Sequence, residues 1–158
     1  MIVGIGVDLV DIARFERTIQ RTPRLIDRMF GPTERDLPLR SLAARYAARE
    51  ALIKACGGSE GLRFEDCVIT PEASGRPWFT LTGPSAAIVA EKGITTLHLS
   101  MSHDGGFAIA YVIAEAADGA APSASVSLEA AAATAQASSQ PHTASDPADR
   151  SVSTEGGA

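Results

Sequence analysis

Two carboxylates, Asp8 and Glu50, are the residues of this sequence best suited to chemistry. Asp8 comes late in an apolar stretch, on a face that it shares with Gly4 and Gly6. Glu50 lies in a long expected helix and, at about 100° per residue, falls within its apolar stripe. A carboxylate on such a stripe is costly unless it is paired, protonated or bound to a metal. Two hard oxygen ligands without a nearby histidine suit Mg²⁺, which completes its shell with waters and substrate phosphates. The pair therefore indicates a magnesium site that handles phosphate.

Purely structural roles for the same two residues are also consistent with the spacing. Glu50 and Lys54 are four positions apart, which allows an ion pair on one helix face worth roughly 0.3–0.5 kcal/mol if exposed. Asp8 could cap the helix that is expected to follow at 11–20. From the spacing alone, both explanations stay open.

A series of arginines follows at spacings of 3, 4, 3 and 4 residues: Arg14, Arg17, Arg21, Arg24 and Arg28. One continuous helix would place them within about 80° of arc, although Pro23 predicts two helices instead. A basic stripe is often only a solvated face. Its functional interpretation is a docking surface for an acidic protein, because complementary charge speeds encounter and sets the register.

His103 is a weaker candidate, at the end of the expected strand that contains Ser100 and Ser102. A histidine in such a place is more often structural than catalytic. The nearby serines lack the G-x-S-x-G sequence of an α/β-hydrolase nucleophile.

The elements that must position these residues follow from periodicity, turns and caps. Thr22-Pro23 is expected to open the second helix, and Ser41 to cap the long helix that ends at Gly57-Gly58. We expect strands at 2–9, 67–70, 78–81, 96–102 and 107–114, and helices at 11–20, 23–30, 41–56 and 84–92. Because strands and helices do not alternate regularly, the fold class predicted is α+β.

Composition limits the remaining possibilities. The chain has 158 residues and a net charge of −5, but residues 1–117 hold 13 basic and 14 acidic residues and are nearly neutral. With aromatics at only 5%, nucleic acid is not an expected partner. Residues 118–158 are rich in Ala, Ser and Pro and are expected to form a disordered tail behind one domain, 1–117. No signal peptide or membrane span is recognised, so a cytoplasmic location without membrane contact is expected.

These residues, in this order, resemble the holo-acyl-carrier-protein synthases, the small bacterial type of 4'-phosphopantetheinyl transferase. The opening Gly4–Asp8 is similar to the first motif of that family, and residues 45–55 (RYAAREALIKA) to its central W/F-x-x-K-E-x-x-x-K helix. Residues 75–77 and 81–83 resemble its hairpin, and Ser100–His103 its closing S-x-S-H strand. One departure is visible, since Arg49 stands where the family usually has lysine. Charge is kept, but the geometry of a phosphate contact could differ.

The resemblance implies a small domain of antiparallel strands packed against a long central helix. It also implies transfer of phosphopantetheine from coenzyme A to a serine of an acyl carrier protein, in fatty-acid or polyketide synthesis, with release of adenosine 3',5'-bisphosphate. By analogy, Asp8 and Glu50 hold Mg²⁺, and Glu50 acts as base toward the serine, directly or through a water. Lys54 would stabilise the leaving phosphate, Arg49 and His103 would contact coenzyme A, and a homotrimer is implied.

The same analogy assigns an acidic carrier protein to the basic series, with Arg14, Arg17, Arg21 and Arg24 as docking residues. A non-catalytic module that docks an acidic protein stays in competition, with Asp8 and Glu50 as structural ion pairs. A nucleic-acid binder is a distant third alternative.

Overall fold

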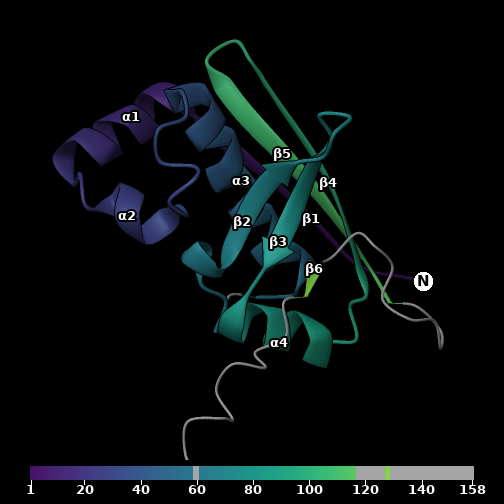
Figure 1. Ribbon diagram of the computed structural model, residues 1–158. Helices are drawn as coiled ribbons and strands as arrows, with labels where there is room; N and C mark the ends of the chain where they lie inside the picture. Colours follow the sequence, from purple (N-terminus) through teal and green to yellow (C-terminus); the bar gives the residue numbers. More distant parts are fainter. Residues whose placement is uncertain (59–60, 117–126, 129–158) are drawn as a thin grey trace, which may run out of the picture.

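The computed structural model describes residues 1–58, 61–116 and 127–128, and it confirms the α+β prediction (Figure 1). The strands are β1 (Ile2–Asp11), β2 (Cys67–Pro71), β3 (Pro77–Leu81), β4 (Thr96–Asp104), β5 (Phe107–Glu115) and β6 (Ser127–Leu128). The helices are α1 (Ile12–Arg21), α2 (Leu25–Met29), α3 (Leu39–Ala55), α4 (Gly83–Glu91) and the 3₁₀ turn η1 (Phe64–Asp66).

The main sheet has the order β1-β5-β4 and is antiparallel throughout. Strand β1 spans the first motif, and its Asp8 lies opposite Ala110 of β5. A Gly105-Gly106 turn joins β4 to β5, as expected from the sequence. This sheet is the platform on which the long helix α3 lies (Figure 1).

Small residues let α3 approach β1 unusually closely. A Cβ at Gly6 would overlap the carbonyl oxygen of Ala51, and a Cβ at Gly4 that of Ala55. The backbone of α3 therefore occupies the space that side chains at Gly4 and Gly6 would take on this face of β1. Tight packing of this kind fixes the position of β1 side chains relative to those of α3.

A second sheet contains the β2–β3 hairpin, with Ile69, Phe79 and Leu81 in the core. Strand β6 pairs in parallel with β3 through Thr80 and Leu81. At Ser127–Leu128 the structure thus shows a strand within the segment expected to be disordered. The rest of that expectation, for 118–158, and the domain boundary it implies lie outside the described residues.

The helix caps expected at Asp8, Thr22 and Ser41 are all wrong. The carboxylate of Asp11 accepts the backbone N–H of Arg14 at 2.9 Å and caps α1. Helix α3 begins at Leu39, two residues before Ser41, and its N-cap residue is Pro38, which makes no side-chain cap hydrogen bond. Helix α2 begins after Arg24 rather than at Pro23, and the break between α1 and α2 is confirmed.

Within the described part of the chain, no helix has the length and apolar character needed to cross a membrane.

Candidate active site

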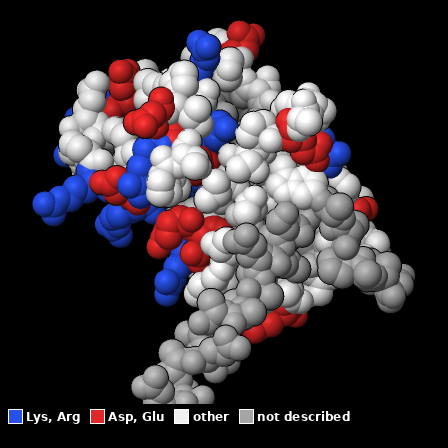
Figure 2. Space-filling view, viewed as in Figure 1, with Lys and Arg blue, Asp and Glu red and all other residues white. Residues whose placement is uncertain are grey.

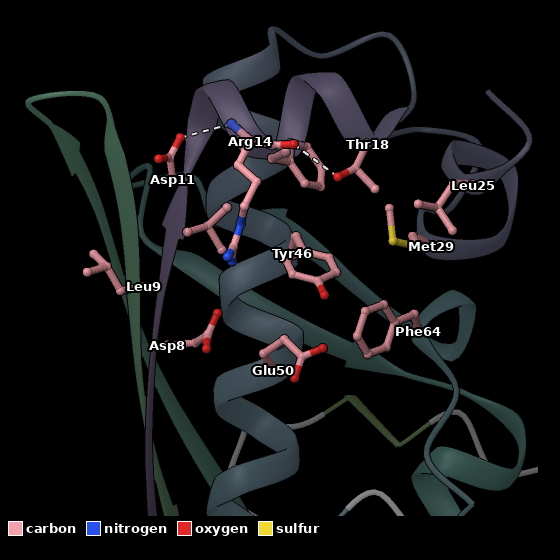
Figure 3. A pocket seen from close by; sticks show the side chains of 12 residues that line it. Asp8, Leu9, Asp11, Arg14, Thr18, Leu25, Met29, Tyr46, Glu50 and Phe64 are labelled. Atoms are coloured by element: carbon pink, nitrogen blue, oxygen red, sulfur yellow. Dashed lines mark hydrogen bonds between the residues drawn. The ribbon is translucent and has the colours of Figure 1, made fainter. Parts of the chain in front are cut away.

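A cavity of about 430 Å³ lies where the end of β1 meets α1, α2, α3 and η1 (Figure 3). Asp8 and Glu50 both line it, one from β1 and the other from α3. Figure 3 shows the guanidinium of Arg14 pointing toward Asp8, and the carboxylate of Glu50 turned toward Tyr46 and Phe64 at the same cavity. The two carboxylates singled out in the sequence thus meet at one site.

Asp8 is held by Lys54 rather than acting as a helix cap. The Lys54 ammonium donates to Asp8 Oδ1 at 2.8 Å and to the carbonyl oxygen of Val7 at 2.9 Å. The Asp8 side chain is 18% exposed and that of Lys54 is 50% exposed. Both structural explanations for the pair are therefore corrected, because Asp11 caps the helix and the ion pair of Lys54 is with Asp8.

Glu50 is half-buried and faces the cavity rather than the core. The core-facing side of α3 is formed mainly by its alanines together with Leu52, because these small side chains fit against the glycines of β1. Tyr46 lies one helical turn before Glu50 and lines the same cavity. Burial and the nearby carboxylates of Glu50 and Asp8 raise the pKa of the Tyr46 hydroxyl.

The residues at this cavity fit a magnesium ion that shares its ligands with a substrate. Among residues 1–58, 61–116 and 127–128, no cluster of three or more His, Cys, Asp or Glu could enclose a metal ion. Mg²⁺ is commonly held by one or two carboxylates together with waters and substrate phosphates. Asp8 and Glu50 supply two such carboxylates beside open volume, so the donor set suits Mg²⁺ in the presence of a phosphate ligand.

Arg49 belongs to the interior, contrary to the expected contact with coenzyme A phosphates. Arg49 is 1% exposed and forms a buried ion pair with Glu34. The guanidinium also donates to the carbonyl oxygens of Phe64 at 3.0 Å and Arg45 at 3.1 Å, and lies 5.1 Å from the ring centre of Phe30. Burial lowers the pKa of Arg49, and the Glu34 carboxylate opposes this effect only in part. Successive residues on a helix point about 100° apart, so Arg49 points away from the cavity that Glu50 lines. The contacts of Arg49 in the interior occupy its guanidinium.

The basic residues expected to dock a carrier do not share one environment. Arg14 lines the cavity, whereas Arg17, Arg21 and Arg24 are exposed on α1 and at the start of α2. Figure 2 shows many Lys and Arg side chains over α1 and α2, with some Asp and Glu side chains among them. The arrangement places a basic surface directly beside the two carboxylates.

His103 lies near the cavity but does not line it. It is exposed on β4, opposite Ala108, which in turn pairs with Val10 of β1. Because side chains alternate along a strand, His103 shares the α3 face of the sheet with Leu99 and Asp8. Strand β5 lies between His103 and β1, so the expected contact of His103 with coenzyme A stays a prediction.

Sequence reasoning missed the aromatic wall of the cavity. The ring of Tyr46 lies 5.4 Å from that of Phe15 and 5.6 Å from that of Phe64, and Leu25 and Met29 extend the wall. The only sequence signal was the i,i+4 spacing of Tyr46 and Glu50, since Phe15 and Phe64 reach the site through tertiary packing.

The outer face of the sheet was also missed. Large apolar residues are 40–58% exposed there on β1 and β5: Val3, Ile5, Val7, Leu9, Phe107, Ile109 and Tyr111. They form cross-strand pairs, for example Val7 with Tyr111 and Leu9 with Ile109. A continuous exposed apolar face of this kind is typical of a protein interface.

The structure defines a small α+β protein in which two carboxylates line one cavity, and comparison with known proteins narrows that class. The family model of the 4'-phosphopantetheinyl transferase superfamily matches residues 4–112, so the chain belongs to this superfamily. The resemblance seen in the sequence is thereby confirmed.

Individual relatives agree with this assignment. The chain is 55% identical over 115 residues to a holo-[acyl-carrier-protein] synthase of Clavibacter sepedonicus, which covers 73% of this chain and 97% of the relative. The solved holo-[acyl-carrier-protein] synthase of Neisseria meningitidis is 35% identical with a TM-score of 0.66, over 73% of this chain and 99% of that chain. The Helicobacter pylori enzyme, solved in complex with coenzyme A, is 35% identical with a TM-score of 0.63, over 70% and 99%.

Proposed function

We propose that this protein transfers the 4'-phosphopantetheine group of coenzyme A to a serine of an apo-acyl carrier protein, giving the holo-carrier and adenosine 3',5'-bisphosphate. The observation that carries the proposal is that Asp8 and Glu50 line one cavity in a chain of this superfamily. The coenzyme A complex of the Helicobacter pylori relative supports coenzyme A as the donor. We further propose that the reaction serves fatty acid biosynthesis in the cytoplasm.

The chemistry assigned to the residues is an in-line displacement at phosphorus. The serine oxygen forms a bond to the phosphorus that carries pantetheine, and the bond to the bridging pyrophosphate oxygen breaks. Glu50 is half-buried beside open volume and accepts the proton of the serine hydroxyl. Lys54, one turn further along α3, contacts the phosphate that departs with the nucleotide.

Asp8 and Glu50 would hold Mg²⁺, which neutralises the pyrophosphate and orients it for attack. Asp8 is fixed in β1 by the close packing of Gly6 on α3, so its carboxylate stands at a defined position relative to Glu50. Such preorganisation lowers the barrier because the site does not need to rearrange.

The basic surface of α1 and α2 supports docking of an acidic carrier. Arg17, Arg21 and Arg24 present their charge to solvent, and Arg14 connects this surface to the cavity. Reversing Arg17 and Arg21 to glutamate is expected to raise the KM for the carrier about tenfold or more and to leave the KM for coenzyme A unchanged. Steady-state kinetics at two salt concentrations would test this, and an unchanged KM for the carrier would argue against the assignment.

The apolar outer face of β1 and β5 supports the proposal of a homotrimer. An exposed face with Ile5, Val7, Ile109 and Tyr111 is costly in a monomer, and self-association would bury it. Analytical ultracentrifugation is expected to show a trimer for the natural chain and a monomer for a Tyr111→Glu variant. A monomeric natural chain at micromolar concentration would contradict the proposal.

The central test of the activity is the mass of a carrier protein. After incubation of apo-carrier with coenzyme A, Mg²⁺ and this protein, the carrier should gain the mass of one phosphopantetheine group. A carrier whose acceptor serine is replaced by alanine should gain nothing. If the apo-carrier gains no mass while a competent phosphopantetheinyl transferase modifies it, the proposal fails and a non-catalytic binding module becomes the better account.

A further inference from the structure

Lys54 forms an ion pair with the same carboxylate that the proposed function gives to a metal. Its ammonium lies 2.8 Å from Asp8 Oδ1 and 2.9 Å from the carbonyl oxygen of Val7. The two side chains come from α3 and β1, 46 positions apart in the sequence. The contact is therefore a tertiary feature of the site rather than a local helix pair.

The cation is the movable partner of this pair. The side chain of Asp8 is 18% exposed and grows from a strand packed tightly on α3, whereas that of Lys54 is 50% exposed. A lysine has a flexible four-carbon stem and a compact, strongly hydrated charge, so it can leave a partner without disturbing the backbone. Asp8 has no comparable freedom.

Lys54 and a divalent cation exclude one another at Asp8. Two positive charges a few ångströms apart repel strongly where water is partly excluded, and Asp8 is mostly buried. Lys54 engages Asp8 Oδ1, so a metal ion bound to Asp8 favours withdrawal of Lys54 along its helix face. Lys54 lines the neighbouring cavity of about 250 Å³, and its Cα is one helical turn from Glu50, so the withdrawn ammonium can reach an anion bound beside Glu50.

We propose that Lys54 is the resident counter-ion of Asp8 in the free protein, competes there with the divalent metal, and transfers to a phosphate of coenzyme A when substrate binds. The inference rests on the proposed function and adds two effects of opposite sign. Lys54 weakens metal binding to the free protein, and it raises turnover of the loaded enzyme. It also makes coenzyme A and metal bind cooperatively, because the phosphate draws Lys54 away from Asp8.

The first measurement uses the full chain with Mn²⁺ alone, since a site of hard oxygen ligands accepts Mn²⁺ as well as Mg²⁺. Binding is followed by the electron paramagnetic resonance signal of free Mn²⁺, without coenzyme A or carrier. Lys54→Met keeps the length of the stem and removes the charge, and it is expected to bind Mn²⁺ about tenfold more tightly than the natural chain. The same variant should turn over about 100-fold more slowly with coenzyme A and carrier.

Two further variants serve as controls. Lys92→Met makes the same change at another lysine of the 250 Å³ cavity that Lys54 also lines, and it should leave Mn²⁺ affinity unchanged. Lys54→Arg keeps the charge and should bind Mn²⁺ as weakly as the natural chain. Lys54→Gln is a second neutral variant if Lys54→Met does not fold, as judged by its thermal unfolding.

The outcomes separate this inference from the proposed function. Equal or weaker Mn²⁺ binding by both neutral Lys54 variants, with binding by the natural chain intact, would overturn the counter-ion role alone. Failure of Mn²⁺ to bind to the natural chain and to the neutral variants, even with coenzyme A present, would overturn the metal site of the proposed function as well. Tighter Mn²⁺ binding together with slower turnover would support the inference, since a purely structural lysine predicts neither.

Discussion

Arg49 and Glu50 are neighbours on α3, yet they belong to different regions of the molecule. Arg49 is almost fully buried, and its guanidinium is shared by Glu34 and two carbonyl oxygens. Glu50 is half-buried and lines a cavity of about 430 Å³ beside Asp8. Helix α3 thus contributes Arg49 to a closed interior ion pair on one side and Glu50 to the open cavity on the next.

The two regions differ in whether the carboxylates already have all their hydrogen-bond and ion-pair partners. Glu34 accepts the backbone N–H groups of Gly31 at 3.0 Å and Ile69 at 3.2 Å, and it also meets Arg45 at 3.4 Å. A carboxylate with so many donors has no capacity left for a ligand, and it serves to join α3 to the loop before it and to β2. Asp8 has a movable lysine as its partner, and Glu50 faces open volume, so these groups can change partners during a reaction.

The largest expected effect comes from opening the interior region. Glu34→Ala leaves Arg49 with a buried, unpaired charge, and we expect it to lower the free energy of unfolding by about 3–5 kcal/mol. Urea denaturation followed by circular dichroism measures this change. A double variant, Glu34→Ala with Arg49→Met, should recover part of the loss, because it removes the unpaired charge. Equal stability of the natural chain and Glu34→Ala would contradict the interior assignment.

Glu50→Gln makes the matching change in the cavity region. Turnover should fall by about 10²–10³-fold, because the amide can neither take the serine proton nor bind metal as a carboxylate does. The free energy of unfolding should stay within about 0.5 kcal/mol of that of the natural chain. Mass analysis of the carrier over time and urea denaturation give the two values, and full activity would break the comparison.

Arg49→Lys tests the boundary between the two regions directly. Lysine cannot reproduce the planar set of guanidinium donors, so stability is expected to fall by about 1–2 kcal/mol. The KM for coenzyme A should not change, because Arg49 contacts Glu34 and backbone carbonyls instead of the cavity. A raised KM with unchanged stability would instead favour the phosphate contact expected from the sequence.

The smallest effect is expected at an exposed ion pair, for contrast with Glu34. Glu115 lies 2.8 Å from His98, and its hydrogen bond to His98 lowers the pKa of the carboxyl group. A carboxyl whose pKa is lowered in the folded state stabilises the fold above its ordinary pKa, and this contribution is lost as pH falls through the folded value. His98→Asn should raise the pKa of Glu115, as followed by NMR, with little change in stability. A pKa of Glu115 that is equal in both proteins would show that the pair does not form in solution.

Local patterns in the sequence predicted the elements well and their ends poorly. The strands and helices lie within a few residues of the expected bounds, because alternation and turn residues act over short distances. The caps at Ser41 and Thr22 were wrong, because a cap depends on where the preceding chain enters the helix.

The candidate site was predicted in part. The sequence indicated Asp8 and Glu50, and the structure brings them to one cavity. The stripe argument for Glu50 was wrong, because the alanines of α3 form the core face once Gly4 and Gly6 allow close approach. Alanine and glycine contribute little to a hydrophobic periodicity, although here they decide which face of α3 packs against β1.

Long-range pairings account for what the sequence could not show. The partner of Arg49 is Glu34, which lies 15 positions away in a loop, and the partner of Lys54 is Asp8 on another element. No periodicity links such residues, so the phosphate role of Arg49 was a reasonable expectation that burial corrects.

Calorimetry of coenzyme A binding, with and without Mg²⁺, tests the central claim about Asp8 and Glu50 most directly. The account predicts that Mg²⁺ strengthens coenzyme A binding to the natural chain by about tenfold or more, and that it has no such effect on Asp8→Asn. Binding of coenzyme A that is equally strong with and without Mg²⁺ in the natural chain would contradict it, as would a full Mg²⁺ effect in Asp8→Asn.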